Sequence, residues 1–150
     1  MDAPRVTIRN SVQSDVFALS RQIGSDDTSM RTVHGMKVRR VLRDAFKQSP
    51  YCRTALVGDE VAAMWGVAGS LAAMDGHAWV TLGPIAKRHS IWELVRYLRQ
   101  EMARMGAERP KLFTVIADGD ATAERFASIA GFKIGAVVAP GIRACHLRGR

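Results

Sequence analysis

Apolar and polar positions along the chain follow two periodicities, one typical of strands and one typical of helices. Residues 5–9 alternate polar and apolar side chains, with β-branched residues among the apolar ones, which predicts a strand. Residues 35–48 repeat apolar side chains at helical spacing, with basic residues on the other faces. The pattern predicts strands at 5–9, 51–57, 60–69, 77–82, 111–117, 132–138 and 141–147, helices after Ser14 and at 35–48, 90–105 and 121–130, a loop at 24–32, and turns at 58–59, 75–76 and 83–84.

Several side chains are positioned to begin or end these elements. We expect Ser14 and Asp120 to cap the helices that follow them, and Ser90 with Glu93 to form a capping box. Gly131 is expected to end the last helix with a positive φ. The element order β-α-α-β-β-β-α-β-α-β-β predicts one domain of the mixed α/β class, with helices packed around a largely antiparallel sheet.

The composition is ordinary, but the charge is not. The 150 residues are enough for one domain and hardly enough for two. Twenty-two Lys and Arg residues against fourteen Asp and Glu residues give a net charge of +8, which points to a polyanionic partner as one option. The longest uncharged stretch, 61–74, is shorter than a membrane span of about 20 residues, and no secretory signal is visible. Two isolated cysteines fit a reducing compartment, so we expect a cytoplasmic protein that is not secreted.

Residues 111–133 carry a resemblance to a known family. A buried strand there ends at a polar turn, and the short helix that follows ends in Gly131-Phe132-Lys133. The segment resembles a strand–helix–strand unit of the GNAT-fold N-acetyltransferases, and the element order over residues 5–147 is similar to the same fold. A narrower resemblance is to the small GNAT-like proteins of tailed phages, some labelled internal virion protein A. It rests on the opening strand, the Trp-bearing strand at 77–83 and the basic connection at 86–90.

The resemblance implies acetyl-CoA as the cofactor, held by a loop that precedes the long helix. Members of the family use an Arg/Gln-x-x-Gly-x-Gly/Ala loop, whose backbone N–H groups approach the pyrophosphate. If Leu94 takes the family's leucine position, His89 and Ile91 stand where the two glycines belong. A β-branched residue resists a positive φ, so the segment is interpreted either as a degenerate coenzyme site or as an ordinary capped helix start. If acetyl-CoA binds, its candidate ligands are Leu82, Lys87, Arg88, His89 and Ser90.

The general acid and general base that the resemblance implies also depart from the family's pattern. Family members commonly place a tyrosine after the phenylalanine of the last helix, and here Phe126 is followed by Ala127. Ser128 is adjacent, although a serine hydroxyl is a poor general acid at neutral pH. His77 is the nearby titratable side chain whose ordinary pKa suits a general base. The catalytic candidates are therefore Ser128 and His77. The alternative interpretation of His77 is that it is a turn residue with no catalytic role.

Other catalytic patterns are weaker. The basic neighbour Arg53 favours a lowered thiol pKa for Cys52, but no histidine lies at a motif spacing from it. Cys145 and His146 are neighbours on a predicted strand, so we expect them on opposite faces. No His, Cys, Asp or Glu residues have the spacing of a metal site, and we expect no metal.

Two features of the sequence bear on partners. Basic residues gather in the second helix and could neutralise nucleic-acid phosphates, meet an acidic protein, or form a solvated face. Met64 and Trp65 are expected in the core, unless one sheet face is uncovered and exposes one of them as a protein interface. The residues for nucleic acid or an acidic partner are Lys37, Arg39, Arg40, Arg43 and Lys47, with Arg143, His146, Arg148 and Arg150 near the C-terminus.

Three hypotheses about function follow. The first is a phage-type GNAT-fold protein with a degenerate acetyl-CoA site, acting as a virion-associated or host-directed binding component in the host cytoplasm and the virion. Its partners would be other phage or virion proteins. The alternative is an acetyl-CoA-dependent N-acetyltransferase for a protein or small-molecule amine, in which amides of strand 79–82 hold the thioester and His77 or water deprotonates the amine. The third is a basic nucleic-acid-binding module. The sequence leaves open whether the chain is an enzyme and which oligomer it forms.

Overall fold

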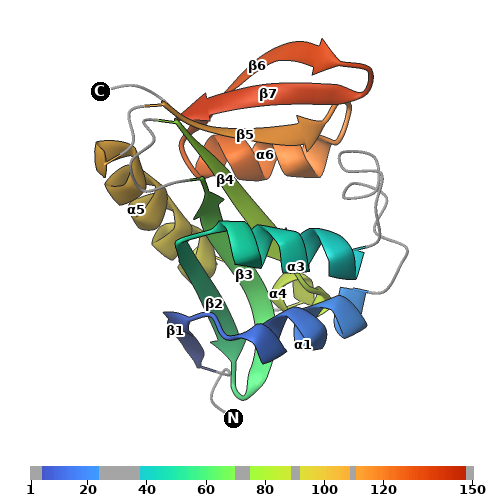
Figure 1. The fold of residues 1–150 in the computed structure, drawn as a ribbon, viewed down its shortest axis with the longest axis vertical. Coiled ribbons are helices and arrows are strands. Elements are labelled where there is room, and N and C mark those ends of the chain that lie inside the picture. The colour runs from blue at the N-terminus through green and yellow to red at the C-terminus, as the bar shows by residue number, and fades with distance from the viewer. Residues whose placement is uncertain (1–4, 24–37, 70–74, 89–91, 109–110, 148–150) are drawn as a thin grey trace.

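Seven strands form one mixed sheet in the computed structural model, which describes residues 5–23, 38–69, 75–88, 92–108 and 111–147. Neighbouring strands run antiparallel except β4 and β5, which run parallel, so the predicted mixed α/β class is confirmed. The sheet order is β1-β2-β3-β4-β5-β7-β6 (Figure 1). The strands are β1 (Val6–Asn10), β2 (Tyr51–Val57), β3 (Glu60–Ala68), β4 (Asp75–Leu82), β5 (Lys111–Ala117), β6 (Phe132–Ala139) and β7 (Ile142–Leu147).

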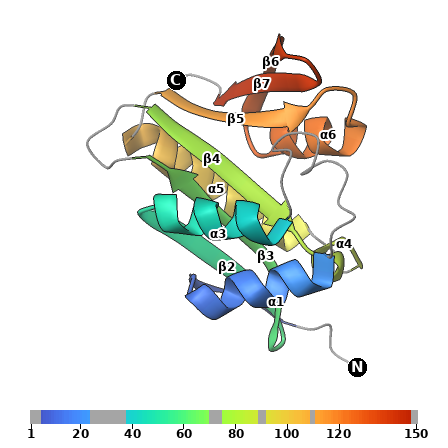
Figure 2. The same cartoon turned by 45° about the vertical axis from the view of Figure 1, so that its right-hand side comes forward.

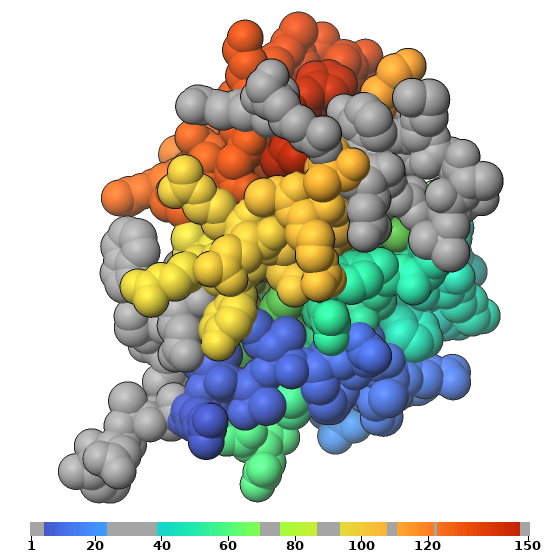
Figure 3. Space-filling model, turned by 90° about the vertical axis from the view of Figure 1, so that its left-hand side faces the viewer, coloured from blue at the N-terminus to red at the C-terminus, as the bar shows by residue number. Residues whose placement is uncertain are grey.

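Helices cover both faces of this sheet (Figure 1, Figure 2). On one face α1 (Gln13–Ile23) and α3 (Val38–Gln48) pack side by side and share a hydrophobic cluster with the strands beneath them. On the other face lie α4 (Pro84–Arg88), α5 (Trp92–Glu108) and α6 (Ala121–Ile129), which share a larger cluster. In Figure 3, α5 crosses the side of the molecule between the C-terminal strands above it and the N-terminal elements below it.

The two clusters explain why β3 is apolar almost throughout. Successive side chains of a strand point to opposite faces, so Met64 packs with Leu19 and Leu42 beneath α1 and α3, while Trp65 packs with Leu98 of α5. All five side chains are fully buried. Because both faces are covered, neither Met64 nor Trp65 forms the exposed protein interface considered from the sequence.

Local signals predicted several features correctly. The hairpin between β2 and β3 turns at Gly58, which has a φ of +62°. Asp120 caps α6, since its Oδ1 atom accepts a hydrogen bond from the Ala123 N–H at 3.0 Å. Gly131 ends the same helix with a φ of +106°. These features depend on residues a few positions apart, so the sequence pattern was enough to predict them.

Three local predictions were wrong. Ser14 does not cap α1, because the helix begins at Gln13 and the Asp15 Oδ2 atom accepts the Val12 N–H at 2.9 Å. Residues 75–76, predicted as a turn, are the first two residues of β4, where pairing with β5 holds them extended. The glycine-free connection after β4 begins as the short helix α4, and α5 continues to Glu108 rather than ending at 105.

Some sequence-based predictions lie outside the described residues. These are the loop at 24–32, the start of the second helix at 35–37, and the capping box of Ser90 with the Glu93 side chain. Within the described part of the chain, no helix is long and apolar enough to cross a membrane.

Candidate functional site

The centre of the sheet contains a divergence between its two parallel strands. β4 and β5 pair only at Asp75–His77 with Lys111–Phe113. Beyond this point β4 stays paired with β3 as far as Leu82, whereas β5 stays paired with β7. The two strands therefore separate along their length, as Figure 1 and Figure 2 show. We call the edge of β4 that faces this separation, residues 78–82, the β4 edge.

Hydrogen bonding identifies which backbone groups lie on the β4 edge. The Gly83 N–H donates to the Ala62 carbonyl at 2.8 Å, so Gly83 directs its backbone groups toward β3. Alternate residues of a strand share this direction, so the backbone groups of Thr81 also point toward β3. The backbone groups of Val80 and Leu82 point the opposite way, away from β3. Val80 and Leu82 thus present N–H and C=O groups toward the separation, beyond the last residue pair that β4 makes with β5.

The end of β4 leads directly into α4 rather than into an open loop. Ile85 and Ala86 are 5% and 3% exposed and belong to the hydrophobic cluster beneath α5 and α6. Leu82 is partly buried against the same cluster. The first part of the predicted pyrophosphate segment is therefore packed as a helix against the sheet. Four of the predicted coenzyme ligands cannot be placed, because His89 and Ser90, and the side chains of Lys87 and Arg88, are outside the described structure.

His77, one of the two predicted catalytic candidates, lies away from the open end of the β4 edge. The His77 ring stacks on Phe113, with ring centroids 5.1 Å apart, at the end of β4 where the two strands still pair. Leu82 is five residues further along the strand, or roughly 16 Å at the usual rise per residue. Ser128 is exposed on α6, whereas Ala127, at the family's tyrosine position, is buried. The structure thus keeps the His77 ring at the paired end of β4, away from Leu82.

The acidic turn after β5 has a structural role. Asp118 accepts hydrogen bonds from the Arg143 guanidinium at 2.9 and 3.1 Å, and this contact raises the pKa of Arg143. Arg143 also donates to the Gly135 carbonyl at 2.8 Å. The cation predicted as part of a C-terminal basic patch is therefore paired within the fold. His146 is exposed, and Arg148 and Arg150 lie outside the described residues.

The thiols do not have the properties of catalytic nucleophiles. Burial raises the pKa of Cys52 to about 11, so the lowered pKa predicted from its basic neighbour is wrong. The Arg53 guanidinium donates instead to the Tyr51 hydroxyl at 2.8 Å. Burial also raises the pKa of Cys145. As expected for strand neighbours, Cys145 is buried and His146 exposed. No group of three His, Cys, Asp or Glu residues able to hold a metal occurs among the residues that the structure describes.

Comparison with solved structures identifies the fold. A GNAT-family acetyltransferase from Bacillus anthracis matches with a TM-score of 0.67 and 10% identity, covering 97% of this chain and 96% of that one. The ribosomal-protein-S18-alanine N-acetyltransferase of Escherichia coli matches with a TM-score of 0.64 and 13% identity, covering 95% and 93%. An acetyltransferase from Agrobacterium tumefaciens gives a TM-score of 0.68 and 10% identity over 99% and 93%.

The chain therefore has the GNAT fold, and the fold implied by the sequence resemblance is confirmed. No family model and no curated protein matches the sequence. At these identities the structural likeness shows the fold, and function has to be argued from the site. Under the acetyltransferase hypothesis, amides of strand 79–82 hold the thioester. In the structure, the backbone groups of Val80 and Leu82 are the ones in this strand that point away from β3. The sequence does not distinguish these two residues from their neighbours, because the distinction depends on the direction of the hydrogen bonds between strands.

Proposed function

We propose that the chain binds acetyl-CoA along the β4 edge and is an N-acetyltransferase for a protein or small-molecule amine. The observation that carries this proposal is the outward direction of the Val80 and Leu82 backbone groups in the middle of a sheet. Backbone N–H and C=O groups at such a position need partners. An extended ligand with amide groups, such as the pantetheine arm of the coenzyme, can bind there like an added strand.

The same backbone groups could promote acetyl transfer. Acetyl-CoA supplies an acetyl group activated as a thioester. An N–H of Val80 or Leu82 that donates to the thioester oxygen would stabilise the negative charge that develops there as the amine attacks. Ala127 cannot protonate the departing thiolate, and His77 stacks on Phe113 far from Leu82, so we assign the proton transfers to water.

A second candidate is favoured by the start of α4. Its buried Ile85 and Ala86 fix a helix where the family's coenzyme loop begins, and the segment as far as Ser90 contains no glycine after Gly83. On this hypothesis the chain is a phage-type GNAT-fold protein that has kept the scaffold and lost the coenzyme. It would then act as a virion-associated or host-directed binding component, with phage proteins as partners.

Calorimetric titration of acetyl-CoA separates the two candidates. The first predicts micromolar binding that weakens about tenfold in Arg88→Ala, because a cation near the phosphates is lost. Arg125→Ala, which removes an exposed arginine of α6, is the matched control and should bind as the wild type does. Absence of heat up to millimolar coenzyme would contradict the first candidate and favour the second.

A proline substitution tests the donor on the β4 edge. Leu82→Pro removes an N–H that makes no bond to β3, whereas Leu82→Ala keeps the N–H and loses the side chain. We expect Leu82→Pro to lower the acetylation rate by roughly a hundredfold or more, as loss of one such donor does in acyl transfer, and Leu82→Ala to retain most of it. The products are measured by mass spectrometry of an amine substrate, and thermal unfolding checks that both variants fold. Equal rates for the two variants would remove the Leu82 N–H from the mechanism.

A further inference from the structure

Positive charge gathers on the outer face of α1 and α3. Asp44 is the carboxylate of these two helices that reaches solvent, because Asp15 is 2% exposed and is paired with Arg9 through hydrogen bonds of 2.7 and 2.9 Å. Asp44 itself lies 3.9 Å from Arg43, a distance at which an exposed pair contributes little. The exposed cations on this face are Arg21, Arg39, Arg40, Arg43 and Lys47.

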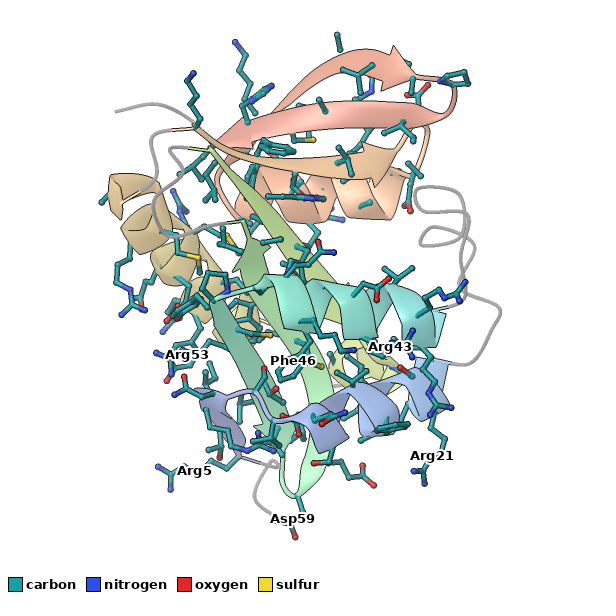
Figure 4. All side chains as sticks on the ribbon, viewed as in Figure 1. Arg5, Arg21, Arg43, Phe46, Arg53 and Asp59 are labelled. Atoms are coloured by element: carbon teal, nitrogen blue, oxygen red, sulfur yellow. The ribbon has the colours of Figure 1, made fainter. Side chains whose placement is uncertain are left out.

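The two long helices on the other face of the sheet, α5 and α6, do not share this excess. α5 contains three arginines and three glutamates, and α6 contains one of each. In α5, Arg104 and Glu101 pair at 3.4 Å. The basic surface of α1 and α3 is therefore not shared by α5 and α6. Figure 4 shows Arg21 and Arg43 on the side of the molecule formed by these two helices.

An aromatic ring accompanies the cations. Phe17 of α1 is 42% exposed, and the Arg39 guanidinium of α3 lies over its ring, 4.3 Å from the centroid. A guanidinium that lies over an exposed ring presents its own outer face to solvent, and nucleic-acid bases stack on both kinds of group. Phe17 and Arg39 together therefore offer a stacking site beside the other cations of this face.

We propose that the α1–α3 face binds single-stranded nucleic acid. The cations would contact successive phosphates, and Phe17 with Arg39 would stack an unpaired base. A duplex keeps its bases stacked and cannot use Phe17. An acidic protein would need a wider apolar centre than one ring partly covered by an arginine. This activity is separate from acetyl transfer and requires no coenzyme.

Fluorescence anisotropy with a labelled oligothymidylate of about 20 nucleotides tests the proposal in the full chain without coenzyme. The double variant Arg40→Gln/Arg43→Gln should bind about tenfold more weakly at moderate salt. It should also lower the slope of log K against log salt by about 1.4, since each single-strand phosphate contact contributes about 0.7. The matched control is Arg96→Gln/Arg99→Gln, which removes two exposed arginines of α5 and the same charge, and it should bind as the wild type does.

Phe17→Leu provides an independent readout. Loss of stacking should weaken binding about tenfold while leaving the salt slope unchanged, because no phosphate contact is removed. Equal weakening by the α5 control would overturn the proposal in favour of binding by overall charge. Polyglutamate that competes as well as the oligonucleotide, with no effect of Phe17→Leu, would overturn it in favour of an acidic protein partner. Thermal unfolding of each variant separates loss of binding from loss of the fold.

Discussion

The Asp15→Ala variant should lose about 3 kcal/mol of the free energy of unfolding, the largest effect we expect from one polar side chain of this protein. The Asp15 carboxylate accepts both Arg9 hydrogen bonds, the Val12 N–H at 2.9 Å and the Thr54 hydroxyl at 2.9 Å. Alanine removes all four hydrogen bonds at the junction of β1, β2 and α1, where Thr54 keeps the Ser11 hydroxyl and Arg9 keeps the Asn10 carbonyl as partners. Denaturant unfolding measures the loss. Asp44→Ala, which removes a carboxylate of α3 whose cation is 3.9 Å away, is the control and should change stability by less than about 0.5 kcal/mol.

The same carboxylate makes stability depend on pH at the acidic end. Burial alone would raise the pKa of Asp15, but the hydrogen bonds from Arg9, Val12 and Thr54 and the Arg9 charge outweigh burial and lower it. A carboxylate with a lowered folded pKa contributes its full stabilisation above the unfolded value of about 3.9, and loses it as the pH falls through the folded value. The difference in stability between wild type and Asp15→Ala should therefore shrink as the pH falls below the unfolded value. A constant difference across this range would show that the charge of Asp15 is not what stabilises the junction.

The Gly66→Ala variant should also lose about 3 kcal/mol, for a steric reason. A Cβ atom at Gly66 of β3 would lie 2.6 Å from the Tyr51 carbonyl oxygen and 3.1 Å from the Trp79 ring. Neither neighbour can withdraw easily. The carbonyl belongs to the paired strand β2, and the Trp79 Nε1 atom donates to the Ser49 hydroxyl at 2.8 Å.

A second glycine provides the control for this steric argument. Gly58→Ala meets no atom within 4 Å and retains only the strain of a positive φ, so it should cost about 1 kcal/mol. Chemical denaturation of the two variants gives the comparison. If both cost the same, the close approach at Gly66 is relieved by small movements of the strands.

Local chemistry made much of the fold predictable from the sequence. The β2–β3 hairpin needs only a turn at Gly58 between two apolar stretches, and the α6 cap needs only Asp120 ahead of a helical pattern. The burial of Trp65 follows from an apolar strand once helices cover both faces. Each of these features is set by neighbours in sequence or by one average property of the chain.

The remaining features depend on contacts between distant residues. Asp15 stabilises its helix through Arg9 and Thr54, and Thr54 lies 39 residues away, so the sequence favoured its neighbour Ser14 as the cap. The β4 edge exists because β4 and β5 pair briefly and then follow different partners, which no single stretch of residues encodes. The direction of the Leu82 N–H likewise depends on the bond that Gly83 makes to Ala62.

The brief pairing of β4 with β5 also has a consequence for how the molecule assembles. Residues 111–147 form β5, α6, β6 and β7, which pair within this segment through short connections and can form early. Strands β1 to β4 pair in consecutive order on the other side. Three residue pairs join the two groups of strands, so we expect each group to fold as a unit before they dock. The separation faced by Val80 and Leu82 then comes into being only at that last step and belongs to neither unit alone.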